Sequence, residues 1–259
     1  MASDPSLSIP PAPPLTSRWD AFDWQPSLAQ QQQFQTLYDL VLQGNQRMNL
    51  TRVTGPEAFW EKHLWDSLRG LWPGLAALPQ PANSQQAESL QVIDIGSGAG
   101  FPGLPAAIAF PHWQVTLLDS TQKKVAFIAE TIEALGLPNA AALAARAEAV
   151  GQAPEHRQRY DLALIRAVAP AVVCAEYALP LLRLGGSAIL YRGQWSTTET
   201  EQLIPVLHQL GGKIQQVDPF TTPLSQGDRH SIVVAKVAPT PPTFPRAVGV
   251  PAKHPLAAP

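Results

Sequence analysis

The sequence contains a single cysteine, Cys174, among 259 residues. One thiol can form neither an internal disulfide nor a multi-thiolate metal site, so the chain has the character of a reduced, intracellular protein. Its six histidines are scattered and form no H-x-x-x-H pair, which gives no indication of a metal site. We therefore expect a cytoplasmic protein that binds no metal.

Long apolar runs and an excess of one charge are also missing. No stretch approaches the roughly 18 apolar residues that a membrane span needs, and the N-terminus has no basic start followed by an apolar segment. Charged residues make up 15% of the chain, and its formal net charge is −2. This charge excludes a protein that binds nucleic acid over its whole surface, so any polyanionic partner must be bound by a local basic patch.

Proline is abundant but concentrated at the two ends. Of 27 prolines, five lie within residues 5–14 and seven within residues 239–259. Segments of this composition run extended and bury little surface. The sequence predicts a disordered extension over 1–25, an N-terminal helical subdomain over 26–88, a sheet domain over 89–237 and an extended tail over 238–259. Removal of residues 1–20 should then leave the stability unchanged.

Two helices are predicted in the N-terminal part. Apolar residues recur at helical spacing over residues 28–46, with a glutamine-rich polar face. Thr54 and Glu57 have the spacing of a capping box, with Pro56 in the first turn, and this predicts the start of a second helix. Together these helices would form a layer beside the rest of the chain.

From residue 89 onward, short apolar runs such as LQVIDI, QVTLLD, YDLALIRA, GSAILYR and SIVVAK alternate with helical segments. This alternation is typical of an α/β fold with a mainly parallel, doubly wound sheet. Ligands of such sheets bind beyond the carboxyl ends of the strands. The segment PAVVCAEYALPLL is predicted to be an apolar helix, which makes Cys174 a core residue rather than a nucleophile.

A glycine-rich turn follows the first strand of this series, and it fits two patterns. Gly98-x-Gly100-x-x-Gly103 matches the dinucleotide fingerprint, but Pro102 would then lie inside the phosphate turn, and the first glycine would stand well beyond the strand-end acid Asp94. The frame D-x-G-x-G-x-G instead resembles the first motif of Rossmann-like S-adenosylmethionine methyltransferases. Since one turn does not decide between them, an NAD(P)-dependent oxidoreductase remains the alternative.

The second strand ends at Asp119, roughly 20 residues beyond the turn, where both nucleotide-binding families place a carboxylate for ribose hydroxyls. Asp119 could instead cap the helix expected to begin near Gln122, because aspartate is a preferred N-cap residue. Both roles can hold at once.

Further blocks, in order and spacing, resemble the bacterial 16S ribosomal RNA guanine-N7 methyltransferase family, also known as the glucose-inhibited division protein B family. The blocks are NLTRVT, EKHLWDSL, DIGSGAGFPGLPAA, LLDS-x-x-KK-x-AFI, RAE, YDLALIRAVA, RGQ and GDRHSIVVAK, and the match as a whole runs from about residue 26 to 237. The resemblance implies an α/β, Rossmann-like class I S-adenosylmethionine methyltransferase sheet with an N-terminal helical layer. It implies methyl transfer from S-adenosyl-L-methionine to a guanine N7 in 16S rRNA, of the guanine-527 class. The partner would be 16S rRNA or the small ribosomal subunit, and we expect a monomer.

The same resemblance assigns site residues. Those implied to contact the cofactor follow the strands of the sheet: Gly96, Phe101, Asp119, Ser120, Thr121, Ala147, Glu148 and Arg166. Those implied to act at the target base are Asn49, His63 and Arg166. Those implied to bind RNA are the basic residues Lys123, Arg146, Arg192 and Arg229. No metal ligand is implied.

Two of these residues need comment. The family usually has lysine where this chain has Arg192, and because a guanidinium fork is not a lysine point charge we retain Arg192 as a phosphate contact only. His63 alone would be interpreted as a packing histidine on a helix, but its place in KHLWDSL favours a functional role. Asp66 could fix the tautomer of His63 across one helical turn, or it could be a solvated acid.

The chemistry implied by the resemblance needs no general base, because guanine N7 carries a free lone pair and no proton. Orientation of the two reactants can contribute up to roughly 7–11 kcal/mol in well-aligned systems. The chain has no NPPY motif of the kind used for exocyclic adenine amines. A non-catalytic rRNA-binding assembly factor that keeps the fold is the remaining alternative.

Overall fold

The computed structural model describes residue 19 and residues 24–77 and 89–257. Most of the extension expected over 1–25 and the stretch 78–88 lie outside these described residues. Trp19 is fully buried, however, and its ring stacks on Phe34 with a centroid separation of 5.9 Å and meets Trp60 edge-on at 5.8 Å. A deletion that includes Trp19 is therefore expected to destabilise the protein, contrary to the sequence-based expectation.

The core of the molecule is a seven-stranded sheet with the order β3-β2-β1-β4-β5-β7-β6. The first five strands run parallel, and β7 lies antiparallel between β5 and β6. The predicted α/β, mainly parallel fold is confirmed. The strands are β1 (Gln91–Ile95), β2 (Gln114–Asp119), β3 (Ala140–Ala144), β4 (Tyr160–Arg166), β5 (Leu182–Arg192), β6 (Gly212–Thr221) and β7 (Asp228–Lys236).

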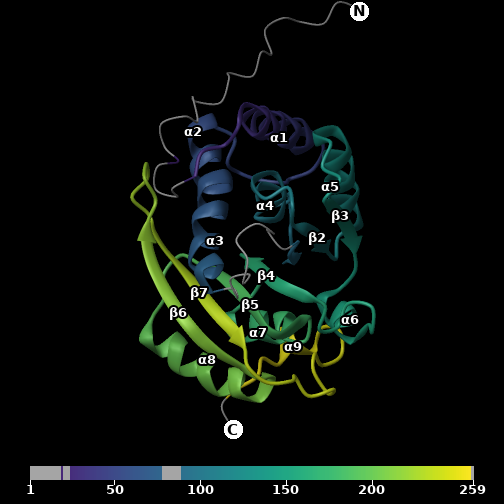
Figure 1. Ribbon diagram of the computed structural model, residues 1–259, viewed down its shortest axis with the longest axis vertical. Coiled ribbons are helices and arrows are strands. Elements are labelled where there is room, and N and C mark those ends of the chain that lie inside the picture. Colours follow the sequence, from purple (N-terminus) through teal and green to yellow (C-terminus); the bar gives the residue numbers. More distant parts are fainter. Residues whose placement is uncertain (1–18, 20–23, 78–88, 258–259) are drawn as a thin grey trace, which may run out of the picture.

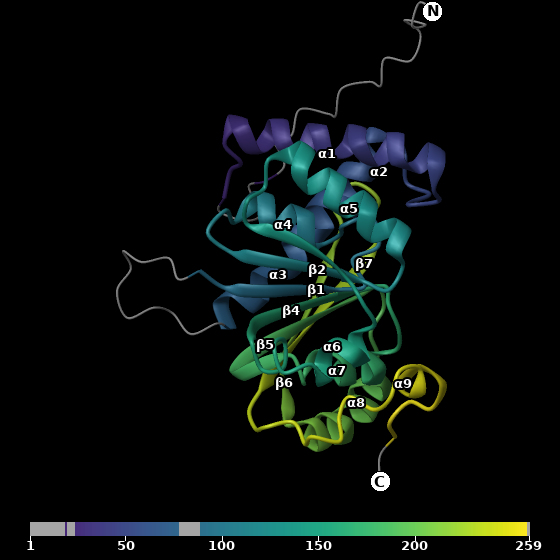
Figure 2. The ribbon, with the colours of Figure 1, turned by 90° about the vertical axis from the view of Figure 1, so that its right-hand side faces the viewer.

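Helices cover both faces of this sheet, as Figure 2 shows with the strands between the two helical layers. Burial on both faces explains why the central strands are nearly continuous apolar runs rather than alternating patterns. One face carries α3 (Asp66–Ala77), α4 (Gly103–Ala109) and α5 (Gln122–Leu135). The other carries α6 (Ala147–Gln152), α7 (Ala171–Ala178), α8 (Thr197–Leu210) and α9 (Val250–Lys253).

The N-terminal helix α1 (Leu28–Arg47) lies outside α4 and α5 as an additional layer (Figure 2). It begins at a capping box in which Ser27 Oγ accepts from the Gln30 amide at 3.3 Å and Gln30 Oε1 accepts from the Ser27 amide at 2.9 Å. The Gln30 side chain also donates to the Ile108 carbonyl at the end of α4, at 2.8 Å. The helix expected over 28–46 is confirmed.

The second predicted helix exists, but its expected capping box is wrong. The N-cap of α2 (Pro56–Phe59) is Gly55, which has no side chain to accept a hydrogen bond, and the helix starts on the fixed backbone angle of Pro56. The chain then continues as a π-helix, η4 (Trp60–Trp65), directly into α3. Periodicity predicted a helix here but not this wider turn, which is often found at functional sites.

The apolar helix expected over PAVVCAEYALPLL ends early. Helix α7 stops at Ala178 because Pro180 disfavours a helical conformation in the residue before it, and β5 already begins at Leu182. Cys174 lies buried in α7, as predicted for a core residue, and burial raises the pKa of its thiol.

The C-terminal segment folds back on the body of the protein instead of extending from it (Figure 1). Arg246 forms a two-pronged ion pair with the buried carboxylate of Glu176 on α7, with a shortest distance of 2.7 Å. Arg157 donates to the carbonyls of Gly151, Phe244 and Thr240 at 2.7–3.1 Å. Proline composition predicts extended backbone, but it does not reveal these side-chain anchors. Among the described helices, none is both long and apolar enough to cross a membrane.

Candidate functional site

The turn after β1 is held mainly by backbone conformation and by backbone hydrogen bonds to β2. Gly96, Gly98 and Gly100 all have positive φ, the region that other residues adopt only with strain. The amides of Gly96 and Ser97 donate to the Leu118 carbonyl of β2 at 2.7 and 3.0 Å. A side chain at Gly96 would also collide with Val168, whose Cγ2 lies 2.5 Å from the position of an added Cβ. The pattern D-x-G-x-G-x-G is thus a conformational requirement of this turn.

Asp94 decides between the two interpretations of this turn. Its Oδ2 accepts from the Gly103 amide at 2.8 Å, so a carboxylate already occupies the start of α4. A dinucleotide pyrophosphate would need that helix end free and would meet the acid there. Burial raises the pKa of Asp94 to about 7, and the hydrogen bond from Gly103 opposes the rise. This arrangement disfavours the oxidoreductase alternative.

Asp119 connects the ends of two loops. Its Oδ2 accepts from the Gly98 amide at 3.0 Å and its Oδ1 from the Thr121 amide at 2.8 Å. The N-cap of α5 is Thr121, so Asp119 is not the capping residue that one interpretation proposed. A carboxylate oxygen has two acceptor positions, and Asp119 therefore keeps unused acceptor positions while it orders the loops.

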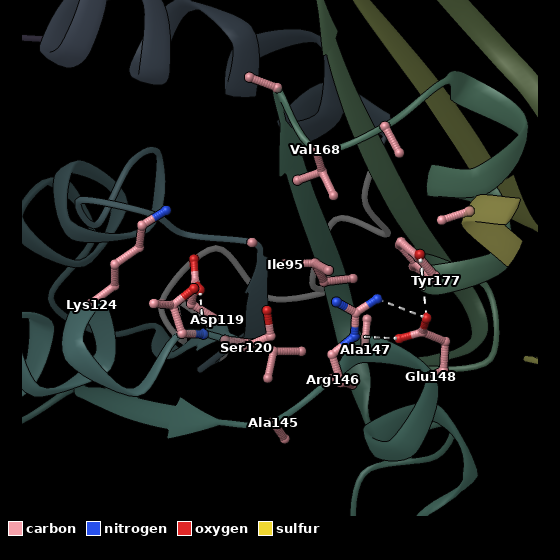
Figure 3. A pocket seen from close by; sticks show the side chains of 16 residues that line it. Ile95, Asp119, Ser120, Lys124, Ala145, Arg146, Ala147, Glu148, Val168 and Tyr177 are labelled. Carbon is pink, nitrogen blue, oxygen red and sulfur yellow. Dashed lines mark hydrogen bonds and ion pairs between the residues drawn. The ribbon is translucent and has the colours of Figure 1, made fainter. Parts of the chain in front are cut away.

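A cavity of about 380 Å³ opens beside Asp119, at the carboxyl ends of β1 to β4 (Figure 3). We call it the first cavity. Six of the eight residues expected at the cofactor line it, namely Gly96, Asp119, Ser120, Thr121, Ala147 and Glu148. Ile95, Leu118 and Val168 add apolar walls. Its volume falls within the roughly 300–1,000 Å³ typical of sites for cofactor-sized molecules.

Glu148 is engaged by several partners at the far wall of the first cavity. Its carboxylate accepts from Arg146 at 3.1 Å and from Tyr177 at 3.4 Å (Figure 3), and it also accepts from the Gly249 amide at 2.9 Å. Burial acts to raise the pKa of Glu148, but Arg146 and the hydrogen bond from the Gly249 amide outweigh it and lower the pKa. The C-terminal segment, whose Ala252 also lines this cavity, is thereby fastened to it.

Sequence reasoning missed Lys124 at this cavity. It named the neighbouring Lys123 for RNA binding, and Lys123 is exposed outside the cavity lining. Lys124 instead extends toward the first cavity (Figure 3). The two lysines are adjacent in the first turn of α5, so only the helical phase, which fixes the direction of each side chain, could have separated them. Arg146, also named for RNA, lines this same cavity beside Glu148.

A second cavity of about 430 Å³ lies next to the first, and Ala167 lines both. The N-terminal helices contribute Lys62, His63 and Asp66 to it, and the sheet contributes residues from the ends of β4 to β7. Its remaining lining residues are Val53, Arg166, Tyr191, Arg192, Gly193, Phe220, Arg229 and His230. Three of the basic and catalytic residues expected at the RNA face, Arg166, Arg192 and Arg229, therefore meet here with His63.

His63 is held as a neutral packing group in this cavity. Its ring stacks on Phe101 with centroids 4.5 Å apart, and its Nε2 shares a hydrogen bond of 2.8 Å with Thr51 Oγ1. Burial, with repulsion from Arg166 and Lys62, lowers the pKa of His63 to about 3. Thr51, rather than Asp66, is the hydrogen-bond partner of His63, because the Asp66 carboxylate forms ion pairs with two arginines.

Asp66 lies buried between two arginines. Its Oδ2 is 3.7 Å from Arg166 Nη1, and its Oδ1 is 3.4 Å from Arg229 Nε. Burial raises the pKa of Asp66, while Arg166 and Arg229 oppose that rise. Arg166 also donates to the Lys62 carbonyl at 2.8 Å, so this guanidinium joins the end of β4 to the N-terminal layer.

Phe101 and Asn49 line neither cavity, and Arg166, which was also expected at the cofactor, lines only the second. Phe101, expected at the cofactor, is buried between His63 and Arg166, whose guanidinium carbon is 5.7 Å from its ring centroid. Asn49 is exposed in the loop after α1 and lines neither cavity. Its neighbour Asn45 orders that loop, because Asn45 Oδ1 accepts from the amides of Leu50 and Thr51.

The described residues contain no group of three or more histidine, cysteine or carboxylate side chains placed to hold a metal ion. The first cavity does fit a nucleoside cofactor. It offers a carboxylate with spare lone pairs, apolar walls and the glycine turn at Gly96. Strand order, turn and carboxylate together define a Rossmann-like methyltransferase of the S-adenosylmethionine class.

The comparison with known proteins agrees with this class. A solved structure described as a mutant of the 16S rRNA (adenine(1408)-N(1))-methyltransferase from Catenulisporales acidiphilia superimposes with a TM-score of 0.50. It is 15% identical and covers 59% of this chain and 87% of its own. At that identity the likeness concerns the fold alone.

Sequence relatives are much closer. The family described as rRNA small subunit methyltransferase G matches residues 30–232. A ribosomal RNA small subunit methyltransferase G from Trichormus variabilis is 52% identical over 94% of this chain and 98% of its own length. A protein of the same name from a Synechococcus strain is 53% identical over 98% of this chain and 96% of its own. The chain belongs to the rRNA small subunit methyltransferase G family, whose enzymes depend on S-adenosylmethionine.

Proposed function

We propose that this protein transfers a methyl group from S-adenosylmethionine to N7 of a guanine in small-subunit ribosomal RNA. The observation that carries the proposal is the pair of cavities joined at Ala167. The first suits a nucleoside cofactor, and the second is walled by charged and aromatic side chains suited to a base. Membership of the family described above supports the choice of rRNA.

The protonation state of His63 in the second cavity also fits the proposed reaction. The pKa of about 3 keeps His63 neutral and leaves it a poor base, and Thr51 already engages its Nε2. An attack by N7 requires no proton removal, because its lone pair forms the new bond to carbon as the carbon–sulfur bond breaks. The cofactor supplies the methyl group as a sulfonium, and the residues of the chain have to orient the base and exclude water.

Charge balance in the second cavity supports the same reaction. Methylation at N7 moves a positive charge from sulfur to the purine, and Arg166 and Arg229 alone would oppose it. Asp66 lies between these arginines and partly cancels their field at the base. We propose that Arg166 orients the base and its phosphate while Asp66 stabilises the charge that develops.

Binding of the RNA that surrounds the target base is assigned to basic residues of the second cavity and of α5. Arg192, Arg229, Lys62 and His230 line it, and Lys123 is exposed on α5. This local cluster fits a chain whose net charge is only −2. Since one chain lines both cavities, we propose that the enzyme acts as a monomer.

The test uses the purified protein, S-adenosylmethionine with a labelled methyl group, and 16S rRNA from cells that lack this enzyme. The rRNA is offered naked and in small subunits, with Arg166→Ala as the matched variant. We expect label at one guanine, located by chemical cleavage at N7-methylguanine, and little label with the variant. Label on another atom or base, or none on either substrate, would reject the proposal.

A further inference from the structure

Two charged side chains in the second cavity have buried polar atoms that form no well-aligned hydrogen bond with a described residue, although one of these atoms lies in the ion pair with Arg229. They are Oδ1 of Asp66 and the Nε and Nη2 atoms of Arg192. Asp66 is only 7% exposed, and its ion-pair distances of 3.4 and 3.7 Å are longer than good charge-assisted hydrogen bonds. Buried polar groups are almost always hydrogen-bonded, so both side chains have capacity for a ligand.

These free groups have opposite hydrogen-bonding character. A carboxylate oxygen only accepts and a guanidinium only donates. Both line the same cavity, together with the flat rings of Phe220 and His63. A ligand that satisfies both needs a planar body, donors on one part of its edge and an acceptor on another.

Guanine has this arrangement and adenine does not. The N1–H and the exocyclic amine of guanine donate, while its O6 accepts. Adenine has an acceptor at N1 and a donor at the exocyclic amine next to it. A base taken out of its stack is commonly recognised by hydrogen bonds to this edge and by stacking on apolar or aromatic groups.

We propose that Asp66 accepts hydrogen bonds from N1–H and the exocyclic amine of the target guanine and that Arg192 donates to its O6. This inference rests on the proposed function and adds the source of its base specificity. Contact with O6 alone leaves N7 unbound and able to attack. It also changes the role of Arg192 from a phosphate contact to a base contact.

The two roles of Arg192 lead to different behaviour in salt. A phosphate contact releases counterions, so its loss reduces the slope of log affinity against log salt by roughly one unit. A contact to O6 leaves that slope nearly unchanged and acts on the choice of base. Arg192→Met keeps much of the side-chain length without any donor and so separates these roles.

The experiment measures kcat/KM for methyl transfer to rRNA fragments that carry guanine, inosine or 2-aminopurine at the target position. All three retain N7. Inosine lacks only the exocyclic amine, and 2-aminopurine lacks O6 and N1–H. For the wild-type protein we expect inosine to be roughly 10- to 100-fold poorer than guanine, because Asp66 loses one of its two hydrogen bonds, and 2-aminopurine poorer still, because it loses the N1–H donor and the O6 acceptor.

The variants sharpen this result. Asp66→Asn should methylate guanine roughly 10- to 100-fold more slowly and lose most of the preference for guanine over inosine. Arg192→Met should lose the part of the preference for guanine over 2-aminopurine that comes from O6, keep the preference for guanine over inosine, and show little change in salt slope. Asp39→Asn, on the outer helix α1, should behave as wild type. Melting temperature and S-adenosylhomocysteine affinity check that each variant folds.

The wild-type substrate series alone can overturn the inference, even if a variant fails to fold. Equal rates on guanine and inosine would remove Asp66 from the base edge while the proposed function stands. A reduction of the salt slope by about one unit in Arg192→Met, with base preference intact, would return Arg192 to a phosphate contact. No methylation of guanine by the wild type would instead reject the proposed function itself.

Discussion

The two cavities are adjacent but built in different ways. The first is formed by loops of the sheet from Ile95 to Tyr177, with Ala252 from the C-terminal segment, and backbone amides hold its central acid Asp119. The second needs the N-terminal helices, and charged side chains such as Asp66 and Arg166 connect its walls. On the proposed assignment of the two cavities, cofactor binding would be a property of the sheet, whereas base recognition would depend on the layer added to it.

The largest effect should come from a residue far from both cavities. Trp19 is fully buried against Phe34 and Trp60, so Trp19→Ala should reduce the free energy of unfolding by about 3–5 kcal/mol. Leu28→Ala, at a side chain that is 83% exposed, should change it by less than about 0.5 kcal/mol. Denaturant unfolding measures both. Equal stability of the two variants would show that Trp19 does not anchor the N-terminal layer.

Arg166→Ala should break the second cavity and leave the first intact. It removes the link to the Lys62 carbonyl and one of the two cations beside Asp66. We expect the single-turnover rate at saturating RNA and cofactor to fall by roughly 10²-fold, because the base loses the side chain proposed to orient it. S-adenosylhomocysteine affinity, measured by calorimetry, should stay near the wild-type value. A wild-type rate at saturation would make Arg166 a binding or structural residue.

Asp119→Ala should produce the opposite pattern. The loss of a charged acceptor should weaken S-adenosylhomocysteine binding by about 1.5–3 kcal/mol, and methyl transfer should recover largely at saturating cofactor. Lys123→Ala, at an exposed position in the first turn of α5, should leave cofactor affinity unchanged. It should reduce the slope of log RNA affinity against log salt by roughly one unit. Unchanged cofactor affinity in a folded Asp119→Ala protein would remove Asp119 from the site.

The smallest effect concerns pH. The folded protein keeps His63 neutral down to a pKa of about 3, whereas the unfolded chain binds a proton below about 6.5. Stability should therefore fall as pH drops below 6.5, relative to His63→Gln, by about 1.4 kcal/mol per pH unit. Unfolding of both proteins at pH 5.5 and 7.5 tests this difference. A parallel response of the two proteins would contradict the neutral, buried state of His63.

The sheet and the first cavity were largely predictable from sequence, because both depend on local patterns. Apolar runs ending in Asp94, Asp119 and Arg166 identified strands, and parallel strands bring their carboxyl ends to one edge. Positive φ at Gly96 belongs to the turn itself and follows from its glycine. Each of these inferences needed only a short stretch of chain.

The second cavity was less predictable, because it depends on contacts between distant segments. The ion pair of Asp66 with Arg229 joins residues far apart in sequence, and the π-helix that carries His63 looks like an ordinary helix in its apolar spacing. Burial of Trp19 inside a proline-rich stretch and the anchoring of Arg246 on Glu176 gave no local signal either. Amino-acid composition predicts the average conformation of a segment, whereas a single buried ring or ion pair determines where that segment lies on the protein.

A double-mutant cycle of Asp119→Ala and Arg166→Ala tests the separation of the two cavities most directly. The measured quantity is S-adenosylhomocysteine affinity in the wild type, both single variants and the double variant, all folded as judged by melting temperature. Independent cavities predict that the two free-energy changes add within about 0.5 kcal/mol, with Asp119→Ala accounting for nearly all of the loss. A coupling above about 1 kcal/mol, or a large loss with Arg166→Ala alone, would contradict the account and make the cavities one site.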